Sequence, residues 1–145
     1  MPSRSAHTLW TGGLEDGHGD VSLTSSGAGS YAVSFPRRAA DEAEGVTSPE
    51  ELIAAAHSSC FAMQFSALIA AAGATPVSLD VTATVSLGPD PAGGFRIPGI
   101  ALVVRGVVDD MDNEAFVRVA LEAKESCPVS KALAGTSITL DAALA

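Results

Sequence analysis

The sequence contains two cysteines, Cys60 and Cys127, separated by 67 positions in a chain of 145 residues. A thiolate can attack a peroxide or a disulfide, so each cysteine is a candidate nucleophile. Cys60 lies inside an apolar run, where the alternative to a reactive thiol is a small, inert core residue. Cys127 precedes Pro128 at the expected start of a short helix, where backbone N–H groups favour a thiolate, although it can also be an incidental cap residue. Position alone leaves both alternatives open.

His57 stands three residues before Cys60, so the two side chains share adjacent turns of a helix and resemble half of a metal site. A closed zinc site needs four ligands, and the chain offers one further cysteine and no second histidine nearby. We therefore expect no metal site, and we expect His57 to be a core histidine with a hydrogen-bond partner.

Arg37 and Arg38 are expected to end the strand that contains Phe35-Pro36, and they precede an acidic loop over residues 41–45. A guanidinium beside a thiolate lowers the pKa of the thiol and can hold an incoming oxygen. The alternative is a solvated pair that balances the acidic loop. Glu50 likewise has two interpretations, a partner of the helix dipole or a carboxylate that orients an arginine through two hydrogen bonds.

The composition indicates one globular domain over residues 1–145, with 47% hydrophobic and 17% charged residues. The formal net charge of −9 argues against binding to nucleic acid, which needs clustered basic residues. Two cysteines are too few for a disulfide scaffold, and no basic segment followed by an apolar one marks a signal peptide. We therefore expect a cytoplasmic protein with reduced thiols.

Residues 52–72 form a run of 21 residues without a formal charge, which is long enough to span a membrane. The run contains His57, Gln64 and three serines, and no lysine or arginine flanks it as an anchor. We therefore expect a core helix that is surrounded by protein, and no membrane association.

The elements around these residues predict an α+β fold. Strands are expected at 7–11, 20–25 and 30–35, separated by glycine-rich turns. A helix should begin at Pro49 with Ser48 as its cap and end near Ala72, before Gly73.

The second half of the sequence continues with an alternating strand at 77–87 and a strand at 95–108 that is interrupted at Pro98-Gly99. A helix at 113–125 is capped by Asp112 and turns Phe116, Val117, Ala120 and Leu121 inward, a short helix extends to Ala134, and a final strand covers 138–142. The order β-β-β-α-β-β-α-α-β differs from that of a doubly wound parallel sheet.

Two segments of the sequence resemble the motifs of the OsmC/Ohr family, which comprises osmotically inducible protein C and the organic hydroperoxide resistance proteins. The first is Thr47 to Met63 (TSPEELIAAAHSSCFAM), and the second is Cys127 to Leu133 (CPVSKAL). The spacing of the cysteines and the flanking strands at 31–38 and 138–140 fit as well, so the resemblance covers nearly the whole chain. His57 and the Cys-Pro-Val-Ser form are closer to the OsmC branch than to the Ohr branch.

The resemblance implies an OsmC-like fold, in which antiparallel sheets wrap a long central helix in an intertwined homodimer. It also implies a peroxidase of organic hydroperoxides, and more weakly of hydrogen peroxide, without a bound cofactor or metal, which acts in oxidative and osmotic stress defence. Cys60 is then the peroxidatic thiol, Cys127 the resolving thiol, and Glu50 the partner of the site arginine. The family arginine precedes an aromatic residue, and Arg37-Arg38-Ala39 lacks that aromatic. Arg38 is favoured because it lies two residues after Pro36, and Arg37 is kept as a substitute.

The implied mechanism passes through a Cys60 sulfenic acid and a Cys60–Cys127 disulfide, which an external dithiol of the lipoyl type or another small dithiol reduces. The apolar neighbours Phe61, Met63 and Phe65 favour organic peroxides if they line the site, although they would serve equally as core. The alternative function is a non-redox small-ligand-binding or thioesterase-like protein with inert core cysteines.

One geometric expectation does not depend on the family. Glu50 and Cys60 are ten residues apart, about 15 Å along a straight helix and roughly 80° around it. Side chains of one continuous helix cannot meet over that distance. If Glu50 serves Cys60, the active site is shared between two subunits or the helix is broken.

Overall fold

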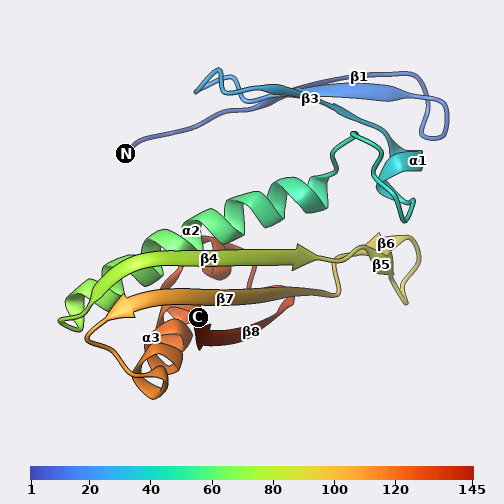
Figure 1. The fold of residues 1–145 in the computed structure, drawn as a ribbon. Helices are drawn as coiled ribbons and strands as arrows, with labels where there is room; N and C mark the ends of the chain where they lie inside the picture. The colour runs from blue at the N-terminus through green and yellow to red at the C-terminus, as the bar shows by residue number, and fades with distance from the viewer. The chain divides into compact units, whose positions relative to one another are not determined.

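The computed structural model describes residues 1–145 (Figure 1). The chain forms two compact units, Met1–Leu52 and Ile53–Ala145. Three strands and a short helix are followed by a long helix, and strands and helices then alternate to the C-terminus. The predicted α+β class is confirmed, while the prediction of one domain over the whole chain stays a prediction.

The first unit contains an antiparallel sheet of three strands, β1 (His7–Thr11), β2 (His18–Ser22) and β3 (Ser30–Val33), in sequential order. The expected third strand ends early, because residues Phe35–Arg38 form a short helix, α1. The Ser34 hydroxyl accepts the Arg37 backbone N–H at 3.4 Å, and Pro36 occupies the first turn, which favours a helix start over a strand. The prediction that the arginines end a strand was therefore wrong.

The long helix α2 covers Pro49–Ala71 without interruption. It begins as predicted, with the Glu51 backbone N–H donating to Ser48 Oγ at 3.2 Å. The Glu51 carboxylate accepts from the Thr47 hydroxyl. Gly73 has a φ of 84°, the left-handed conformation that ends helices and that glycine adopts without steric cost.

The buried side of α2 consists of His57, Phe61, Phe65 and Ile69, four residues apart, and each is fully buried. Its other side is open, and Met63 is 72% exposed. The expectation that protein surrounds the helix is therefore not met within one chain. By length and composition alone α2 could cross a membrane, and 22% of its apolar window is buried.

The second unit contains a sheet of β4 (Thr75–Val85), β7 (Gly99–Asp109) and β8 (Ser137–Leu144), with β7 in the centre. β4 pairs antiparallel to β7, but β8 pairs parallel to it, so this sheet is mixed and not wholly antiparallel. The short strands β5 (Gly88–Pro89) and β6 (Phe95–Arg96) form a separate hairpin. The predicted interruption at Pro98-Gly99 separates β6 from β7 and is confirmed.

The expected inward position of Val77 was wrong, because Val77 is 59% exposed. The register between β4 and β7 shifts between Pro76 and Ser78, so an extra residue stands at that point. The predicted alternation holds beyond the irregularity, where Leu79, Val81 and Ala83 are half-buried.

Two helices follow β7, namely α3 (Asn113–Ser126) and α4 (Pro128–Ala132). Asp112 caps α3 as predicted, accepting the Ala115 backbone N–H at 2.8 Å. The residues that α3 buries are Phe116, Val119, Ala120 and Ala123. The prediction that Leu121 points inward was wrong, because its side chain is exposed. Val117, also expected to point inward, is half-buried.

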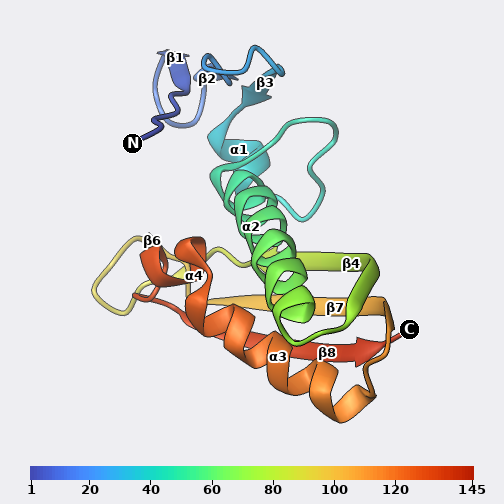
Figure 2. The ribbon, with the colours of Figure 1, turned by 90° about the vertical axis from the view of Figure 1, so that its left-hand side faces the viewer.

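The core of the second unit lies between the helices and one face of the sheet (Figure 2). Phe65 of α2 and Phe116 of α3 meet edge to face with ring centroids 4.8 Å apart. On β7 the side chains Leu102 and Val104 are buried and Val103 between them is exposed, so helices cover only one face of this strand. This packing holds α2 and α4 where their cysteines meet.

Candidate active site

The two cysteines come together although 67 residues separate them. Cys60 lies in the middle of α2, and Cys127 caps the N-terminus of α4. Their Sγ atoms are 3.2 Å apart, one thiol donating a hydrogen bond to the other sulfur, and both are free thiols. A disulfide between them requires the sulfurs to approach by about 1.2 Å, to the usual bond length of about 2.05 Å.

The two thiols differ in their access to solvent. Cys127 is fully buried, whereas Cys60 is partly exposed. A small molecule in solution therefore reaches Cys60 and not Cys127. Any chemistry of Cys127 must take place through what happens at its neighbour.

The two thiols also differ in pKa, because their surroundings in the second unit differ. Burial raises the pKa of Cys60 above its ordinary value, against the effect of the Val129 backbone N–H. Burial also disfavours the Cys127 thiolate, but hydrogen bonds from the Ser130 backbone N–H, the Cys60 thiol and the Ser130 hydroxyl outweigh it and lower the pKa of Cys127. The residues of this unit therefore stabilise a thiolate at the buried cysteine.

His57 is a core histidine with a hydrogen-bond partner, as predicted. It is fully buried, and its Nε2 lies 2.8 Å from Ser130 Oγ, while Nδ1 has no partner. Burial lowers the pKa of His57 below its ordinary value, which favours the neutral imidazole. Ser130 was not among the predicted site residues. Its position three residues after Cys127, the cap of α4, indicates that it lies near that cysteine.

Arg38 and Glu50 form an ion pair, as one interpretation of the sequence predicted. Arg38 Nε lies 3.1 Å from both carboxylate oxygens of Glu50, and Nη2 lies 2.7 Å from Oε1. Burial opposes ionisation of Glu50, but the hydrogen bond from Arg38 lowers the pKa of this carboxyl, and Glu50 in turn raises the pKa of Arg38. Both groups stay charged, and the guanidinium has a fixed orientation.

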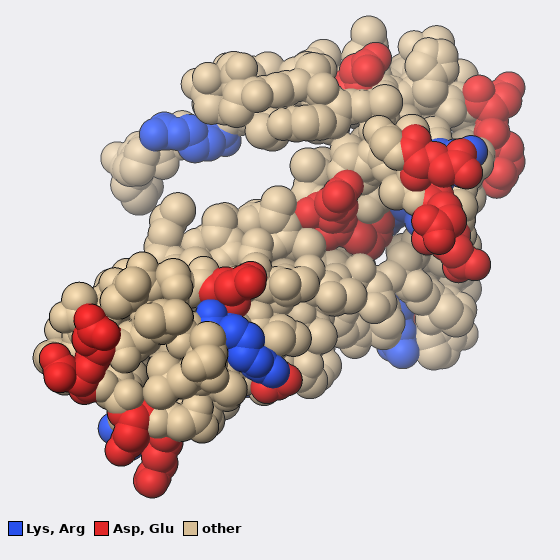
Figure 3. Space-filling view, viewed as in Figure 1, with Lys and Arg blue, Asp and Glu red and all other residues tan.

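The structure also distinguishes the two adjacent arginines. Arg37 pairs with Glu44, an exposed residue of the acidic loop, whereas the carboxylate that holds Arg38 is buried. Basic side chains are sparse on the face of the molecule shown in Figure 3, and acidic ones are widespread. An arginine anchored to a buried carboxylate is therefore a distinct feature of this acidic chain.

A cavity of about 530 Å³ in the first unit has Arg38 as its one charged lining residue. The other lining residues are Thr8, Trp10, Leu14, Val21, Val33, Ser34, Phe35, Pro49 and Leu52. Apolar walls with one oriented cation suit a ligand that has an alkyl or aromatic part and an oxygen function.

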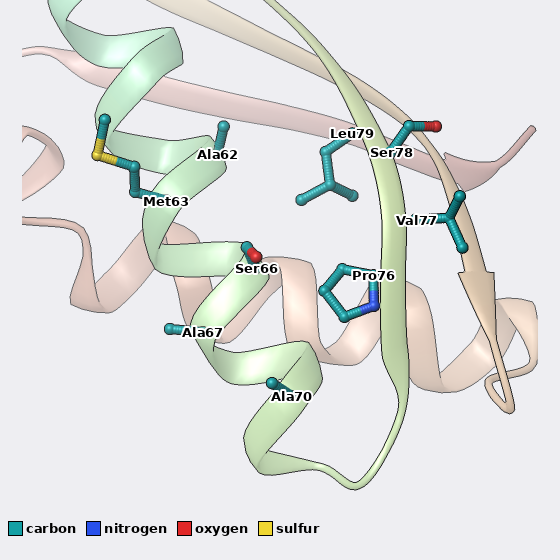
Figure 4. A pocket seen from close by; sticks show the side chains of 9 residues that line it. All are labelled: Ala62, Met63, Ser66, Ala67, Ala70, Pro76, Val77, Ser78 and Leu79. Atoms are coloured by element: carbon teal, nitrogen blue, oxygen red, sulfur yellow. The ribbon is translucent and has the colours of Figure 1, made fainter.

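A second apolar hollow, of about 600 Å³, lies between α2 and the start of β4 (Figure 4). Met63, Ser66 and the alanines of α2 line one side, and Pro76 and Leu79 point toward the helix from β4. Of the two interpretations of Phe61 and Phe65, the structure supports plain core, because both side chains are fully buried. Met63 differs from them, since it faces outward.

The sequence-predicted residues thus form two pairs, each within one unit of the chain. Cys60 and Cys127 belong to Ile53–Ala145, and Arg38 and Glu50 belong to Met1–Leu52. The first pair can form and break one disulfide, which is a two-electron reaction. The second pair can present a fixed positive charge to an oxygen or a thiolate.

Comparison with known proteins finds one family. Residues 42–142 match the family described as OsmC-like protein. Among relatives, the chain is 42% identical to peroxiredoxin OsmC of Escherichia coli (strain K12) over 132 residues, 91% of this chain and 90% of the relative. It is 38% identical over 109 residues to organic hydroperoxide resistance protein OhrA of Bacillus subtilis (strain 168), 72% of each chain.

The fold is also similar to solved structures. The crystal structure of the organic hydroperoxide resistance protein OhrB of Bacillus subtilis matches with a TM-score of 0.75 and 29% sequence identity. The match covers 97% of this chain and 98% of that one. The similarity therefore extends over both compact units.

Proposed function

Because this chain belongs to the OsmC-like protein family, we propose that it is a thiol peroxidase that reduces organic hydroperoxides, and hydrogen peroxide more weakly, to alcohols or water. Relatives are named for a peroxiredoxin and for organic hydroperoxide resistance, which supports a role in stress defence. The match to OsmC is longer and higher in identity than the match to OhrA, and it confirms the predicted OsmC branch.

The observation that carries this proposal is the contact of the two free thiols, one partly exposed and one buried, 3.2 Å apart. Inert core cysteines have no need of a partner at this distance, and a non-redox ligand-binding protein or a thioesterase does not use one. A peroxidase with two thiols uses both features. Exposure lets Cys60 meet the peroxide, and burial reserves Cys127 for the oxidised form of Cys60.

The reaction proceeds in two steps. The Cys60 thiolate attacks one oxygen of ROOH and the O–O bond breaks, so that Cys60 becomes a sulfenic acid and an alkoxide leaves. The alkoxide takes up the proton that the Cys60 thiol lost on ionisation and is released as ROH. Cys127 Sγ then attacks the sulfenic sulfur, so that an S–S bond forms and the S–O bond breaks. The proton of the Cys127 thiol ends on the departing oxygen as water. The sum is one ROOH and two thiols converted to ROH, water and one disulfide.

Arg38 and Glu50 act on the first step in this proposal. Burial raises the pKa of Cys60, so its thiolate needs a positive charge nearby, and Arg38 is a guanidinium already oriented by two hydrogen-bonded oxygens. Arg38 also stabilises the charge that develops on the peroxide oxygen. Glu50 is a positioning residue that holds the guanidinium.

The arginine comes from a second subunit in this proposal. Since α2 is unbroken, ten residues, or about 15 Å, separate Glu50 from Cys60 along the helix axis. The homodimer has further support in apolar surface that one chain leaves open. Met63 and the hollow beside it are uncovered, and Val21 is the only hydrophobic side chain of the first unit that is buried. A second copy of the chain covers these faces and completes each site.

The cavity beside Arg38 takes the organic part of the peroxide. Its volume of about 530 Å³ accommodates an alkyl or aromatic group, and its one charge lies where the peroxide oxygens must be held. This supports organic over inorganic peroxide as the better substrate. An external dithiol, of the lipoyl type or another small dithiol, then reduces the disulfide by exchange, and reduced thiols are the resting state in a cytoplasmic setting.

One experiment tests the proposed function directly. Reduced protein is mixed with one equivalent of cumene hydroperoxide and is then analysed by mass spectrometry and for the released alcohol. We expect one equivalent of alcohol and a mass loss of two hydrogens, with the disulfide mapped to Cys60 and Cys127.

Two variants assign the roles. Cys60→Ser should consume no peroxide beyond the blank, and Cys127→Ser should release alcohol once and show no mass loss. A parent protein that forms no disulfide, or a Cys60→Ser protein that consumes peroxide rapidly, overturns the proposal. The first result would favour the ligand-binding alternative.

A further inference from the structure

A buried histidine next to the reactive thiols has no role in the reaction described so far. His57 is one turn before Cys60 on α2, is fully buried, and contacts Ser130 of α4 at 2.8 Å. Its other ring nitrogen, Nδ1, is buried without a partner. Burying a titratable ring with one nitrogen unpaired is unfavourable, so packing alone would be better served by an apolar side chain.

Ser130 connects this histidine to Cys127. Cys127 is the N-cap of α4, and Ser130 is the third residue of that helix. The third residue lies one turn above the cap, so its backbone N–H faces the side chain of the cap residue. The Cys127 side chain makes no capping hydrogen bond as a thiol, so the hydrogen bond from Ser130 belongs to the ionised form of Cys127. Ser130 is itself buried, with only 7% of its surface exposed.

The unpaired nitrogen determines the direction of these hydrogen bonds. If Nδ1 carried the proton, a buried N–H would lack an acceptor, which is among the least tolerated states in a protein core. The proton is therefore on Nε2, and Nε2–H donates to Ser130 Oγ. This leaves the one hydrogen of the Ser130 hydroxyl free to point at the sulfur of Cys127.

We propose that His57, acting through Ser130, is a positioning residue that holds Cys127 ready to attack oxidised Cys60. The inference rests on the proposed function, in which Cys127 is the resolving thiol. His57 fixes the Ser130 oxygen as an acceptor, and the Ser130 hydroxyl then donates to the Cys127 thiolate. The second step of the reaction thereby becomes fast. Loss of this connection does not slow the first step, because a less ionised Cys127 no longer raises the pKa of Cys60 through its charge.

The pKa of Cys127 is lowered whereas that of Cys60 is raised, and this difference fits the proposed role. The Ser130 backbone N–H and hydroxyl both contribute to the lowered pKa of Cys127. The other titratable group that faces Cys127 is Cys60. Three charged side chains, Lys124, Glu125 and Lys131, share a cavity of about 250 Å³ with Ser130, and Lys124 pairs with Glu125 at 3.2 Å.

The test compares Ser130→Ala, His57→Leu and His57→Gln with the parent, and uses Ser126→Ala as the matched control. Ser126 is the serine adjacent to Cys127, and its hydroxyl donates to the Glu122 carbonyl and accepts from Gln64. Each reduced protein is mixed with one equivalent of cumene hydroperoxide. Alcohol release, sulfenic acid trapped by dimedone, and the disulfide are followed over time. In a Cys60→Ser background, the ultraviolet absorbance of the thiolate is titrated against pH to follow Cys127 alone.

We expect Ser130→Ala and His57→Leu to slow disulfide formation about tenfold, the factor for one lost hydrogen bond to an ionised group. Dimedone-trapped sulfenic acid accumulates, the titration midpoint of Cys127 moves to higher pH, and alcohol release is not slower than in the parent. His57→Gln restores the parent behaviour, because its amide N–H can donate to Ser130. Ser126→Ala stays at the parent values.

Unchanged disulfide formation and an unchanged Cys127 midpoint in a folded Ser130→Ala protein overturn the inference and leave the proposed function intact. A parent protein that forms no disulfide overturns both. If His57→Leu fails to fold, Ser130→Ala and His57→Gln decide the question, since each changes few buried atoms. Loss of function in His57→Gln together with a normal Ser130→Ala protein also contradicts the proposed connection.

Discussion

Cys60 and Cys127 are in sulfur–sulfur contact at 3.2 Å, yet only Cys60 is accessible to solvent. This relationship divides the chemistry between two helices. α2 presents the thiol that a peroxide can reach, and the cap of α4 keeps the second thiol behind it. The arrangement also limits the lifetime of the sulfenic acid, because its partner is already within the contact distance of two sulfurs.

The first prediction concerns over-oxidation. In Cys127→Ser the sulfenic acid at Cys60 has no thiol beside it, so excess peroxide should oxidise it to the sulfinic acid. With ten equivalents of cumene hydroperoxide we expect most of this variant to gain two oxygens by mass, and most of the parent protein to hold a disulfide. Ser126→Ala serves as a neighbouring control and should behave as the parent. Equal over-oxidation of parent and variant would contradict a protective role of Cys127.

The second prediction tests whether Arg38 acts in the reaction at Cys60. Arg38→Lys keeps the charge but loses the planar fork that grips Glu50, so kcat/KM for cumene hydroperoxide should fall about 10- to 100-fold. Arg37→Lys is the matched control, since Arg37 pairs with an exposed residue, and it should stay near the parent value. Measurements under saturating dithiol separate the peroxide step from regeneration.

Complementation tests whether the site is shared between two subunits, and its outcome does not depend on how large the effect of Arg38 is. Arg38→Ala and Cys60→Ser subunits are co-expressed, so that half of the dimers are mixed and one site in each mixed dimer has both intact residues. We expect about a quarter of the parent activity from two variants that are each inactive alone. A mixture without activity would contradict a site built from two subunits.

The third prediction concerns the open face of α2. Met63 is 72% exposed in the single chain, so Met63→Glu should not disturb folding, but it places a charge where the second copy is proposed to pack. Sedimentation velocity should show a dimer for the parent and mainly monomer for the variant, with peroxidase activity lost in parallel. Leu121→Glu, an exposed apolar position on α3, is the control and should remain dimeric. A monomeric parent with full activity would contradict the dimer.

The sequence predicted the parts of this protein that are controlled locally. The start of α2 follows from Ser48, Pro49 and Glu51, and its end follows from Gly73, because caps and stops depend on neighbouring residues. The same local logic failed at Phe35-Pro36, where a proline that suits either an extended segment or a first helical turn was assigned to a strand. The shifted register at Val77 also escaped it, since an irregularity depends on the partner strand.

The candidate site was predictable only as far as residue type and spacing reach. The cysteines stood out by their rarity, but their contact joins positions 67 apart. The sequence favours Arg38 over Arg37 only by its distance from Pro36, whereas the structure distinguishes them by the carboxylate that each one contacts. The contact of His57 with Ser130 joins residues 73 positions apart, and packing of α4 against α2 creates it.

The last prediction is a dependence of stability on pH through His57. Burial lowers the pKa of His57 in the folded protein, whereas the unfolded chain has a histidine pKa of about 6.5. Below about pH 6.5 the unfolded state therefore binds a proton that the folded state rejects, and the free energy of unfolding falls as pH decreases toward the folded pKa. One such proton contributes a slope of at most about 1.4 kcal/mol per pH unit. The lowered pKa of Glu50 acts at more acidic pH, since its contribution is lost only as pH falls below about 4.3. The free energy of unfolding is measured with urea at several pH values between 5 and 7. Its change per pH unit should be smaller in His57→Gln than in the parent, and an equal change in both proteins would contradict a neutral, buried His57.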